Sequence, residues 1–292
     1  MAARLSLRRL VAEDRPLVTP LAHDALTARL IARAGFRSLA VGGSALLAAR
    51  YGLPDIGLAA LGEMAAGIQD IVAATDLPVM VDGDDGYGDV RAVVRMMEVY
   101  ARLGVSGIVL EDQVRVAKQP GDAGAIGVVS VDEMVQKIRV AVAAIGGSEI
   151  QLIARCDASQ LEGLEAAMRR ADRYLHAGAH GIFIPGVPTV EGLRAVGARF
   201  GSAHLMIAVF EGRPTWLPPA ELFAMGFRQV VLPGLLLPRV VRCLDVALED
   251  LKAHAEGRAP MPPLAGAEQA HAALQEALLF GRWMSIGSPA PS

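Results

Sequence analysis

The chain has 292 residues, of which 53% are hydrophobic and 20% are charged, and its formal net charge at pH 7 is −3. Lysines and arginines are scattered rather than gathered in a stripe, which argues against a nucleic-acid surface. Glycine, proline or a charged residue interrupts every long apolar run, so the sequence predicts no membrane span.

The N-terminal residues and the cysteines give no sign of secretion. Residues 1–10 are basic but lack the apolar core of a secretion signal, and we expect them to form a loose tail. Cys156 and Cys243 lie far apart in the chain with no second pair of metal ligands nearby. This predicts reduced thiols rather than a disulfide framework or a zinc site, and a cytoplasmic protein.

A helix followed by a glycine and a short apolar strand recurs four times along the chain. The glycines are Gly35, Gly104, Gly178 and Gly226, and each suits the left-handed cap of a helix that turns directly into a buried strand. Further apolar runs, bounded by polar residues, occupy residues 16–19, 78–81, 151–154 and 204–208. Together they predict eight strands.

Helical stretches separate these strands. Examples are residues 90–103, 131–144, 161–177 and 219–225. Strands that are apolar throughout and alternate with helices are typical of a parallel sheet covered on both faces, and eight such units in roughly 250 residues have the size of a (β/α)₈ TIM-type barrel. The alternative is an open doubly wound sheet, which would more often carry a glycine-rich dinucleotide turn after its first strand, and no such turn is present.

The regular pattern ends near residue 256. Residues 1–256 are predicted to form the catalytic barrel, and residues 257–292 a proline-rich linker and a C-terminal oligomerisation helix. This extra helix, expected over residues 265–280, has an apolar face that we expect to pack on a neighbouring subunit; the residues of that face are Leu274, Ala277, Leu278 and Trp283.

Polar groups follow the predicted strands at their C-terminal ends, where a barrel carries its reactive residues. Asp82 and Asp84 follow the third strand, Glu111 the fourth and Arg155 the fifth, and Glu211 after the seventh is a further candidate for binding substrate. The other ends carry glycine, in Gly42-Gly43-Ser44, Gly186 and Gly234. The set predicts a pocket for a metal ion and an anion.

The densest cluster is residues 82–89, DGDDGYGD, with four carboxylates and three glycines in eight positions. A hard divalent cation such as Mg²⁺ prefers oxygen ligands of this kind. The alternative is an ordinary turn, because aspartate and glycine tolerate positive φ and aspartate bonds its own backbone.

A bound 2-oxo acid would fit such a pocket. Arg155 could grip its far carboxylate in a two-pronged hydrogen bond, and the backbone N–H groups of Gly42-Gly43-Ser44 could face an oxygen that becomes negative as an enolate forms. Each feature has a plainer alternative: Glu111-Asp112 as a helix cap or loop salt bridge, Arg155 paired with Asp157, and the glycines as a tight turn.

At these residues the chain resembles the isocitrate lyase and phosphoenolpyruvate mutase superfamily, from about residue 17 to residue 255. The most specific motifs are residues 82–88, DGDDGYG, and residues 111–113, EDQ. Supporting matches begin at His23, Leu53 and Ile153.

The resemblance implies a divalent-metal enzyme. It makes Asp82 the direct ligand of Mg²⁺, with Mn²⁺ as the alternative ion, and gives Asp55, Asp84 and Glu111 to metal-bound waters. It also gives Arg155 to a substrate carboxylate and the Gly43–Ser44 turn to the enolate. Further implications are a homotetramer or dimer that exchanges a C-terminal helix between subunits, and a gating loop, here residues 114–128.

The predicted gating loop departs from the family's lyases. Lyases of isocitrate and methylisocitrate carry a Lys-Lys/Arg-Cys-Gly-His segment with a working cysteine, whereas residues 117–124 read AKQPGDAG and retain only Lys118. After the sixth strand, residues 184–187 offer no carboxylate, which is nearer to the oxaloacetate decarboxylase branch. That branch has a histidine after the eighth strand, and residues 233–235 supply none.

The sequence therefore predicts a Mg²⁺-dependent lyase of a small 2-oxo acid, closest to an oxaloacetate-type decarboxylase. Such a reaction needs no base to start it, because CO₂ leaves its bonding electrons behind, and water or Lys118 would return the proton. The alternatives are P–C bond chemistry on phosphonopyruvate-like compounds, a methylisocitrate-type C–C lyase, and a ligand-binding relative without turnover. Neither a nucleic-acid nor a membrane partner is expected.

Overall fold

The computed structural model describes residues 6–115 and 127–286. It divides into two compact units, residues 1–235 and 236–292. The helix after the eighth strand belongs to the C-terminal unit, so the boundary in the sequence falls after residue 235. We had expected it at residue 256. Among the described residues, no helix has the length and hydropathy needed to cross a membrane.

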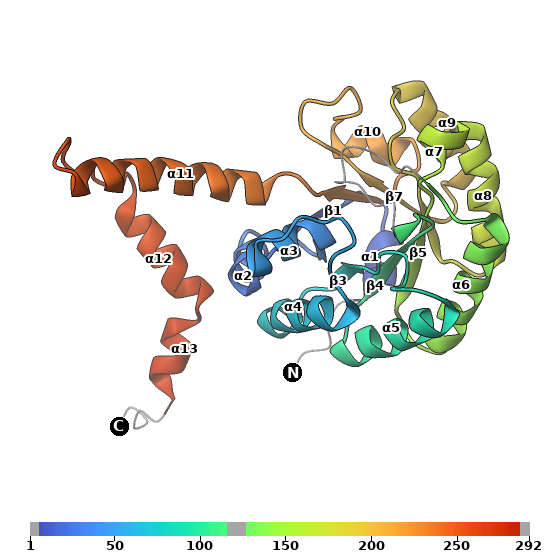
Figure 1. The fold of residues 1–292 in the computed structure, drawn as a ribbon, viewed down its shortest axis with the longest axis horizontal. Coiled ribbons are helices and arrows are strands. Elements are labelled where there is room, and N and C mark those ends of the chain that lie inside the picture. Colours follow the sequence, from blue (N-terminus) through green and yellow to red (C-terminus); the bar gives the residue numbers. More distant parts are fainter. Residues whose placement is uncertain (1–5, 116–126, 287–292) are drawn as a thin grey trace. The chain divides into compact units, whose positions relative to one another are not determined.

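The first unit is an eight-stranded parallel barrel (Figure 1). Its strands are β1 (Leu17–Pro20), β2 (Leu39–Val41), β3 (Val79–Asp82), β4 (Gly107–Glu111), β5 (Gln151–Arg155), β6 (Gly181–Phe183), β7 (His204–Ala208) and β8 (Gln229–Leu232). Strand β1 pairs with β8 in parallel register, and a parallel bridge between Leu21 and Ala40 joins β1 to β2. The predicted (β/α)₈ barrel is confirmed, and the open sheet is excluded.

Helices separate the strands and cover the outside of the barrel (Figure 1). They are α2 (Ala25–Arg33), α3 (Gly43–Tyr51), α4 (Leu61–Ala74), α5 (Val90–Leu103), α6 (Val131–Ala144), α7 (Ser159–Glu162), α8 (Leu164–His176), α9 (Val190–Phe200) and α10 (Pro219–Ala224). The four repeat glycines all have the positive φ that was predicted, between +81° and +108°. The helix predicted over 161–177 is broken at Gly163, where φ is +84°.

Helix α5 illustrates why these segments are helical. Asp89 caps its first turn by accepting hydrogen bonds from the backbone N–H groups of Arg91 and Ala92. Its buried residues, Val93, Met96, Met97 and Tyr100, recur at helical spacing on the face that meets the barrel. Gly104 ends the helix in the left-handed conformation.

A short N-terminal helix, α1 (Leu7–Val11), packs into the barrel core. Leu7, Leu10 and Val11 are buried and join the cluster of inward-facing strand side chains. A Cβ atom at Gly107, the first residue of β4, would lie 2.8 Å from Leu7 Cδ2, so the helix lies at the N-terminal end of that strand. The expectation of a loose tail is therefore wrong from Leu7 onward, because three apolar residues among the arginines bury themselves in the floor of the barrel.

The second unit contains α11 (Leu236–Ala255), α12 (Ala267–Ala277) and α13 (Phe280–Ser285). The single helix predicted over 265–280 is two helices, because Leu279 adopts a left-handed φ of +55° between them. Helix α11 has no buried residue. Its exposed apolar residues Val241, Leu244, Leu248 and Leu251 are spaced three or four apart and share one face of the helix.

Candidate functional site

The carboxylate of Asp82, at the end of β3, lies against the first turn of α3. Asp82 Oδ2 accepts a hydrogen bond of 3.3 Å from the Gly43 backbone N–H, and Asp82 Oδ1 accepts one of 3.0 Å from the Asp84 backbone N–H. A Cβ atom at Gly43 would lie 3.3 Å from Asp55 Oδ2 and 3.4 Å from Asp82 Oδ2. Two of the predicted metal-site carboxylates therefore face the same backbone position.

The predicted oxyanion turn forms the start of α3. Gly42 is the residue before the helix and Gly43 its first residue, and neither has a positive φ. Gly42 instead gives close packing, because a Cβ atom there would lie 2.7 Å from Leu21 Cδ2 and the leucine side chain would have to shift. The N–H groups of the first turn carry the positive end of the helix dipole, and the Gly43 N–H already points at Asp82.

The loop after β3, residues 83–88, has features of both alternatives: it forms a turn with positive φ angles, and it contains buried carboxylates. Asp84, Gly86, Tyr87 and Gly88 have φ values of +47°, +88°, +62° and +143°. Asp85 Oδ1 accepts a hydrogen bond from the Tyr87 backbone N–H. Asp84 and Asp85 are nonetheless buried, so their carboxylates do more than shape a surface turn.

Arg155, at the end of β5, is held by two carboxylates. Its Nη1 atom lies 3.0 Å from Glu111 Oε2, and its Nη2 atom donates a 2.7 Å hydrogen bond to Asp157 Oδ1. Burial alone would lower the pKa of Arg155, but Asp157 and Glu111 outweigh burial and hold that pKa above its ordinary value. The ion pair between Arg155 and Asp157, which was the plainer alternative, is thus present in the structure. The same guanidinium also lies beside Glu111.

Asp112 helps to fix Asp157, the partner of Arg155, through a hydrogen bond. Its fully buried carboxylate accepts hydrogen bonds from the Asp157 backbone N–H at 2.8 Å and from the Tyr174 hydroxyl at 2.7 Å. Burial raises the pKa of Asp112. The neighbouring Cys156 thiol is also buried, and burial raises its pKa, so it stays protonated and unreactive.

The remaining predicted site residues are not gathered in the same way. Ser44 is exposed on the first turn of α3, and Glu211 is exposed in the loop after β7. Lys118 lies outside the described residues. Within the described part of the chain, no group of three or more His, Cys, Asp or Glu side chains is arranged to hold a metal ion.

Two cations beside the acidic loop were missed by the sequence reasoning. Lys137 on α6 donates a 2.9 Å hydrogen bond to the main-chain oxygen of Asp85. Arg115, just after β4, donates hydrogen bonds to Asp85 Oδ1 at 2.5 and 2.8 Å. The sequence does contain one signal for Lys137. It shares a helix face with Met134 and Ala141, and a lysine on such an apolar face is rarely buried unless it has a partner.

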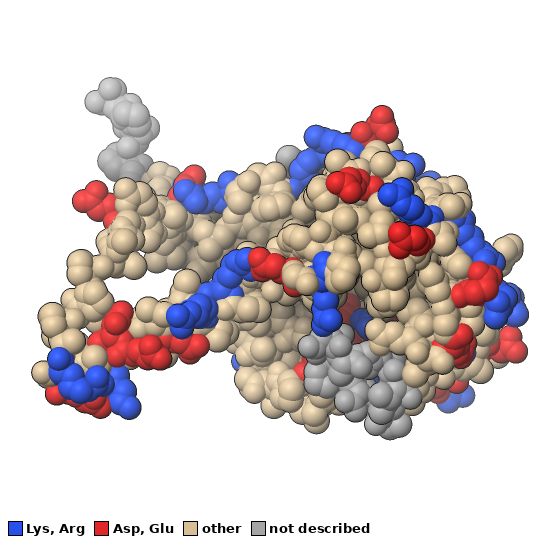
Figure 2. Space-filling model, turned by 90° about the horizontal axis from the view of Figure 1, so that it is seen from above, with Lys and Arg blue, Asp and Glu red and all other residues tan. Residues whose placement is uncertain are grey.

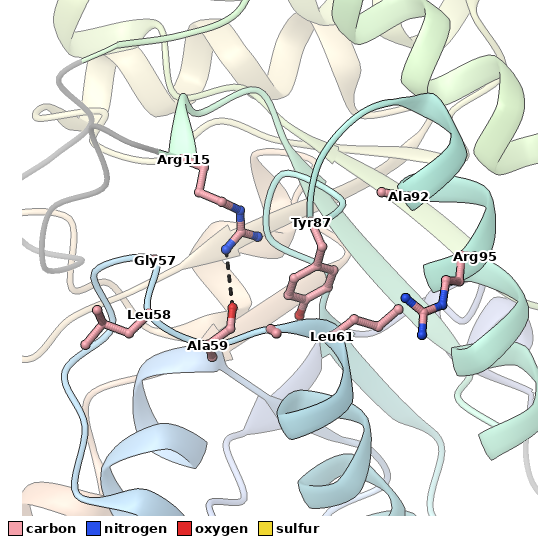
Figure 3. A pocket seen from close by; sticks show the side chains of 9 residues that line it. Gly57, Leu58, Ala59, Leu61, Tyr87, Ala92, Arg95 and Arg115 are labelled. Atoms are coloured by element: carbon pink, nitrogen blue, oxygen red, sulfur yellow. Dashed lines mark hydrogen bonds between the residues drawn. The ribbon is translucent and has the colours of Figure 1, made fainter.

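Arg115 also lines a cavity of about 380 Å³ next to this loop (Figure 3). The Tyr87 ring lies between the side chains of Arg115 and Arg95, and the segment 57–61 forms another wall (Figure 3). Arg115 Nη1 donates a 3.4 Å hydrogen bond to the Ala59 carbonyl oxygen. Arg115 therefore connects the acidic loop to the segment that follows Asp55.

Known proteins are similar to this chain in sequence and in fold. The family described as phosphoenolpyruvate phosphomutase matches residues 7–252. The 2,3-dimethylmalate lyase of Eubacterium barkeri is 35% identical over 233 residues, which cover 80% of each chain. A 2-methylisocitrate lyase of Halalkalibacterium halodurans is 37% identical over 227 residues, which cover 77% of this chain and 74% of that one.

Solved structures agree with these relatives. A crystal structure of 2,3-dimethylmalate lyase has a TM-score of 0.85 at 31% identity and covers 98% of each chain. Oxaloacetate acetylhydrolase in complex with oxalate has a TM-score of 0.84 at 28% identity and covers 98% of this chain and 99% of that one. The fold is a (β/α)₈ barrel, and the relatives of this chain include carbon-carbon lyases. The chain belongs to the phosphoenolpyruvate mutase/isocitrate lyase superfamily, as its motifs predicted.

Proposed function

We propose that this protein is a Mg²⁺-dependent lyase that forms the enolate of a small 2-oxo acid by decarboxylation, with oxaloacetate as the model substrate. The observation that carries the proposal is the meeting of Asp55, Asp82 and the Gly43 N–H at one point of the barrel mouth. The arrangement supports the proposal because these carboxylates could offer oxygen ligands to an ion next to an N–H donor for a developing negative charge.

The donor set fits a hard divalent cation. Within the described residues, Asp82 accepts only backbone N–H groups and forms no ion pair with lysine or arginine, so its charge is available to an ion. Because three side-chain ligands do not converge there, Asp82 would bind the ion directly, and Asp55, Asp84 and Glu111 would act through water, which Mg²⁺ retains readily. Mn²⁺ is the alternative ion. A bound ion would supply electrostatic stabilisation of the enolate.

The chain's own groups would bind and orient the substrate. The Arg155 guanidinium, fixed by Glu111 and Asp157, has further N–H groups for a substrate carboxylate. The first turn of α3, at Gly43 and Ser44, would donate to the oxygen that becomes negative. The C–C bond to the leaving carboxylate breaks, CO₂ departs, and the electron pair stays in the enolate until water or Lys118 returns a proton.

A C–C lyase of a 2-hydroxy acid is the second candidate, because relatives named for 2,3-dimethylmalate and 2-methylisocitrate share more than a third of the aligned residues. Aldol-type cleavage of such a substrate needs a base to take the hydroxyl proton. Cys156 is buried and protonated, and residues 114–128 contain neither cysteine nor histidine. These two facts favour decarboxylation, which needs no base.

The test compares oxaloacetate, 2,3-dimethylmalate and phosphonopyruvate with the purified protein, in Mg²⁺ and in EDTA. Because Mg²⁺ alone decarboxylates oxaloacetate slowly, each rate is corrected by a protein-free sample at the same ion concentration. We expect pyruvate and CO₂ from oxaloacetate and no activity in EDTA. Oxalate and acetate as products would indicate hydrolysis instead, and cleavage of only 2,3-dimethylmalate or only phosphonopyruvate would overturn the proposal. Binding of all three without turnover would support a non-catalytic relative.

We also propose that the protein is a homo-oligomer, a dimer or tetramer that exchanges a C-terminal helix between subunits. The support is the face formed by Val241, Leu244, Leu248 and Leu251 on α11, whose side chains are all exposed within the described chain. Burying such a face against a second copy would remove the cost of exposing it to water.

A further inference from the structure

The acidic loop after β3 has hydrogen bonds of its own, such as the one from the Gly86 N–H to the Gly83 carbonyl oxygen, but two of its residues have an uncommon backbone conformation. Asp84 and Tyr87 both have positive φ, which L side chains rarely adopt. Gly86 also has positive φ, and a Cβ atom there would lie 2.4 Å from Val93 Cγ2, so the loop packs closely against α5 at this point. Residues held in such conformations persist only where the surrounding structure fixes them, so the loop needs support from outside.

Lys137 supports the loop from α6. Its side chain is only 4% exposed, which is unusual for a lysine. Its Nζ atom donates a 2.9 Å hydrogen bond to the main-chain oxygen of Asp85, whereas the nearest carboxylate oxygens, from Glu133 and Asp85, are 3.9 and 4.0 Å away. The strongest contact is thus with the backbone of the loop and not with a counter-charge.

Arg115, just after β4, also supports the loop. Its guanidinium bonds Asp85 Oδ1 through two nitrogens and lies 3.7 Å from Asp84 Oδ2. It also lies over the Tyr87 ring, 4.9 Å from the ring centre, and bonds the Ala59 carbonyl oxygen (Figure 3). One side chain thereby touches all three non-glycine residues of the loop, Asp84, Asp85 and Tyr87.

We propose that Lys137 and Arg115 are positioning residues that hold the acidic loop in the conformation that presents Asp82 and Asp84 to a divalent cation. The inference rests on the metal site of the proposed function. Both side chains are cations near a cation site, so by charge alone they weaken metal binding. Their contribution is to loop geometry, and it must exceed that repulsion.

Charge and geometry predict opposite results for Lys137→Met, which keeps the length and apolar stem of the side chain. If charge dominates, removing a positive group tightens metal binding. If Lys137 positions the loop, binding weakens, and groups that orient metal ligands typically change affinity by about 10-fold or more. We expect the dissociation constant for Mn²⁺, measured from the electron paramagnetic resonance signal of the free ion, to rise about 10-fold.

Arg139→Met is the matched control. Arg139 lies two residues further along α6, is exposed, and loses the same charge without touching the loop. Its Mn²⁺ affinity should be unchanged or slightly higher. Unchanged or tighter binding in Lys137→Met, with the protein folded, would overturn the inference. If the wild-type protein binds no Mn²⁺, the proposed function fails and the inference falls with it.

If Lys137→Met does not fold, Arg115→Gln tests the same claim with the second cation that contacts the loop. Its control is Arg95→Gln, which removes a charge from the same cavity but, within the described residues, no hydrogen bond or ion pair to the loop. We expect weaker Mn²⁺ binding in Arg115→Gln alone, measured at a temperature at which both variants are folded. Equal affinities in the two variants would refute the positioning role.

Discussion

At Gly43, one missing methyl group decides how close two carboxylates can come to the backbone. We predict that Gly43→Ala weakens Mn²⁺ binding about 10-fold, because the added Cβ atom would lie 3.3 Å from Asp55 Oδ2 and 3.4 Å from Asp82 Oδ2 and would crowd the carboxylates of the proposed site. Isothermal titration calorimetry would measure the change. Gly62→Ala on α4, where a Cβ atom meets nothing within 4 Å, should leave affinity unaltered; an equal loss in both variants would contradict the prediction.

A buried histidine away from the acidic residues should make stability depend on pH. His204 Nε2 bonds Gln229 Oε1, and its Nδ1 has no hydrogen-bond partner within the described residues. Burial, which outweighs the bond to Gln229, lowers the pKa of His204 from 6.5 to about 4. Between pH 6.5 and 4 the unfolded chain therefore binds the extra proton. His204 thus makes the free energy of unfolding fall as the pH falls, by up to about 1.4 kcal/mol per pH unit.

Urea unfolding at several pH values would measure this dependence. The neutral variant His204→Asn should be less stable at pH 7, where its packing is poorer, but it should lose less stability than the wild type between pH 6.5 and 4.5. Parallel curves for the two proteins would rule out His204 as the cause.

The residues of the site could be predicted only in part from the sequence. Asp82, Glu111 and Arg155 stand at strand ends, and the barrel rule brings strand ends together. The contacts of Lys137 and Arg115 could not be predicted. Lys137 bonds a main-chain oxygen and Arg115 bonds a loop side chain, and no periodic pattern in the sequence indicates either contact.

Among the elements, α1 shows how far a short segment can mislead. Arginine makes up three of the six residues 4–9, yet Leu7 and Leu10 lie in the barrel core. The repeat strands were predictable because each is followed or preceded by a glycine with a fixed conformational role. A five-residue helix is too short to show a helical period in the sequence. Its structure depends on the packing of Leu7, Leu10 and Val11 against the strand side chains inside the barrel.

We predict that Leu10→Ala destabilises the barrel by about 2–5 kcal/mol, the usual cost of emptying a well-packed core position. Leu10 is 2% exposed and belongs to the buried core cluster of the barrel. Urea unfolding would give the difference. Arg9→Ala on the exposed side of the same helix should cost less than about 0.5 kcal/mol; a loss below 1 kcal/mol for Leu10→Ala would mean that α1 does not contribute to the core.

For the whole molecule, the outstanding feature is a C-terminal unit that buries little of its own apolar surface. Leu244, Leu248 and Leu251 are 56%, 61% and 51% exposed. The acidic and basic residues of Figure 2 are distributed over both units without one large patch of a single sign on the face shown. Apolar burial against a second copy, rather than charge, is therefore the expected basis of assembly.

We predict that Leu248→Glu lowers the molar mass in solution, because a carboxylate buried in an apolar contact is costly unless it is paired. Light scattering after size-exclusion chromatography would report the mass. Glu249→Lys changes the charge of the adjacent, exposed position and should not alter the mass. A monomeric wild-type protein, or an unchanged mass in Leu248→Glu, would be at odds with the exchanged helix.

The most direct test of the account is a crystal structure with Mn²⁺ and oxalate, a mimic of the pyruvate enolate, using anomalous scattering to locate the ion. The account predicts an anomalous peak within bonding distance of the Asp82 carboxylate, with oxalate bound on the side of the ion that faces Gly43 and Arg155. An Asp82 carboxylate without a neighbouring peak, or an ion held elsewhere, would contradict it.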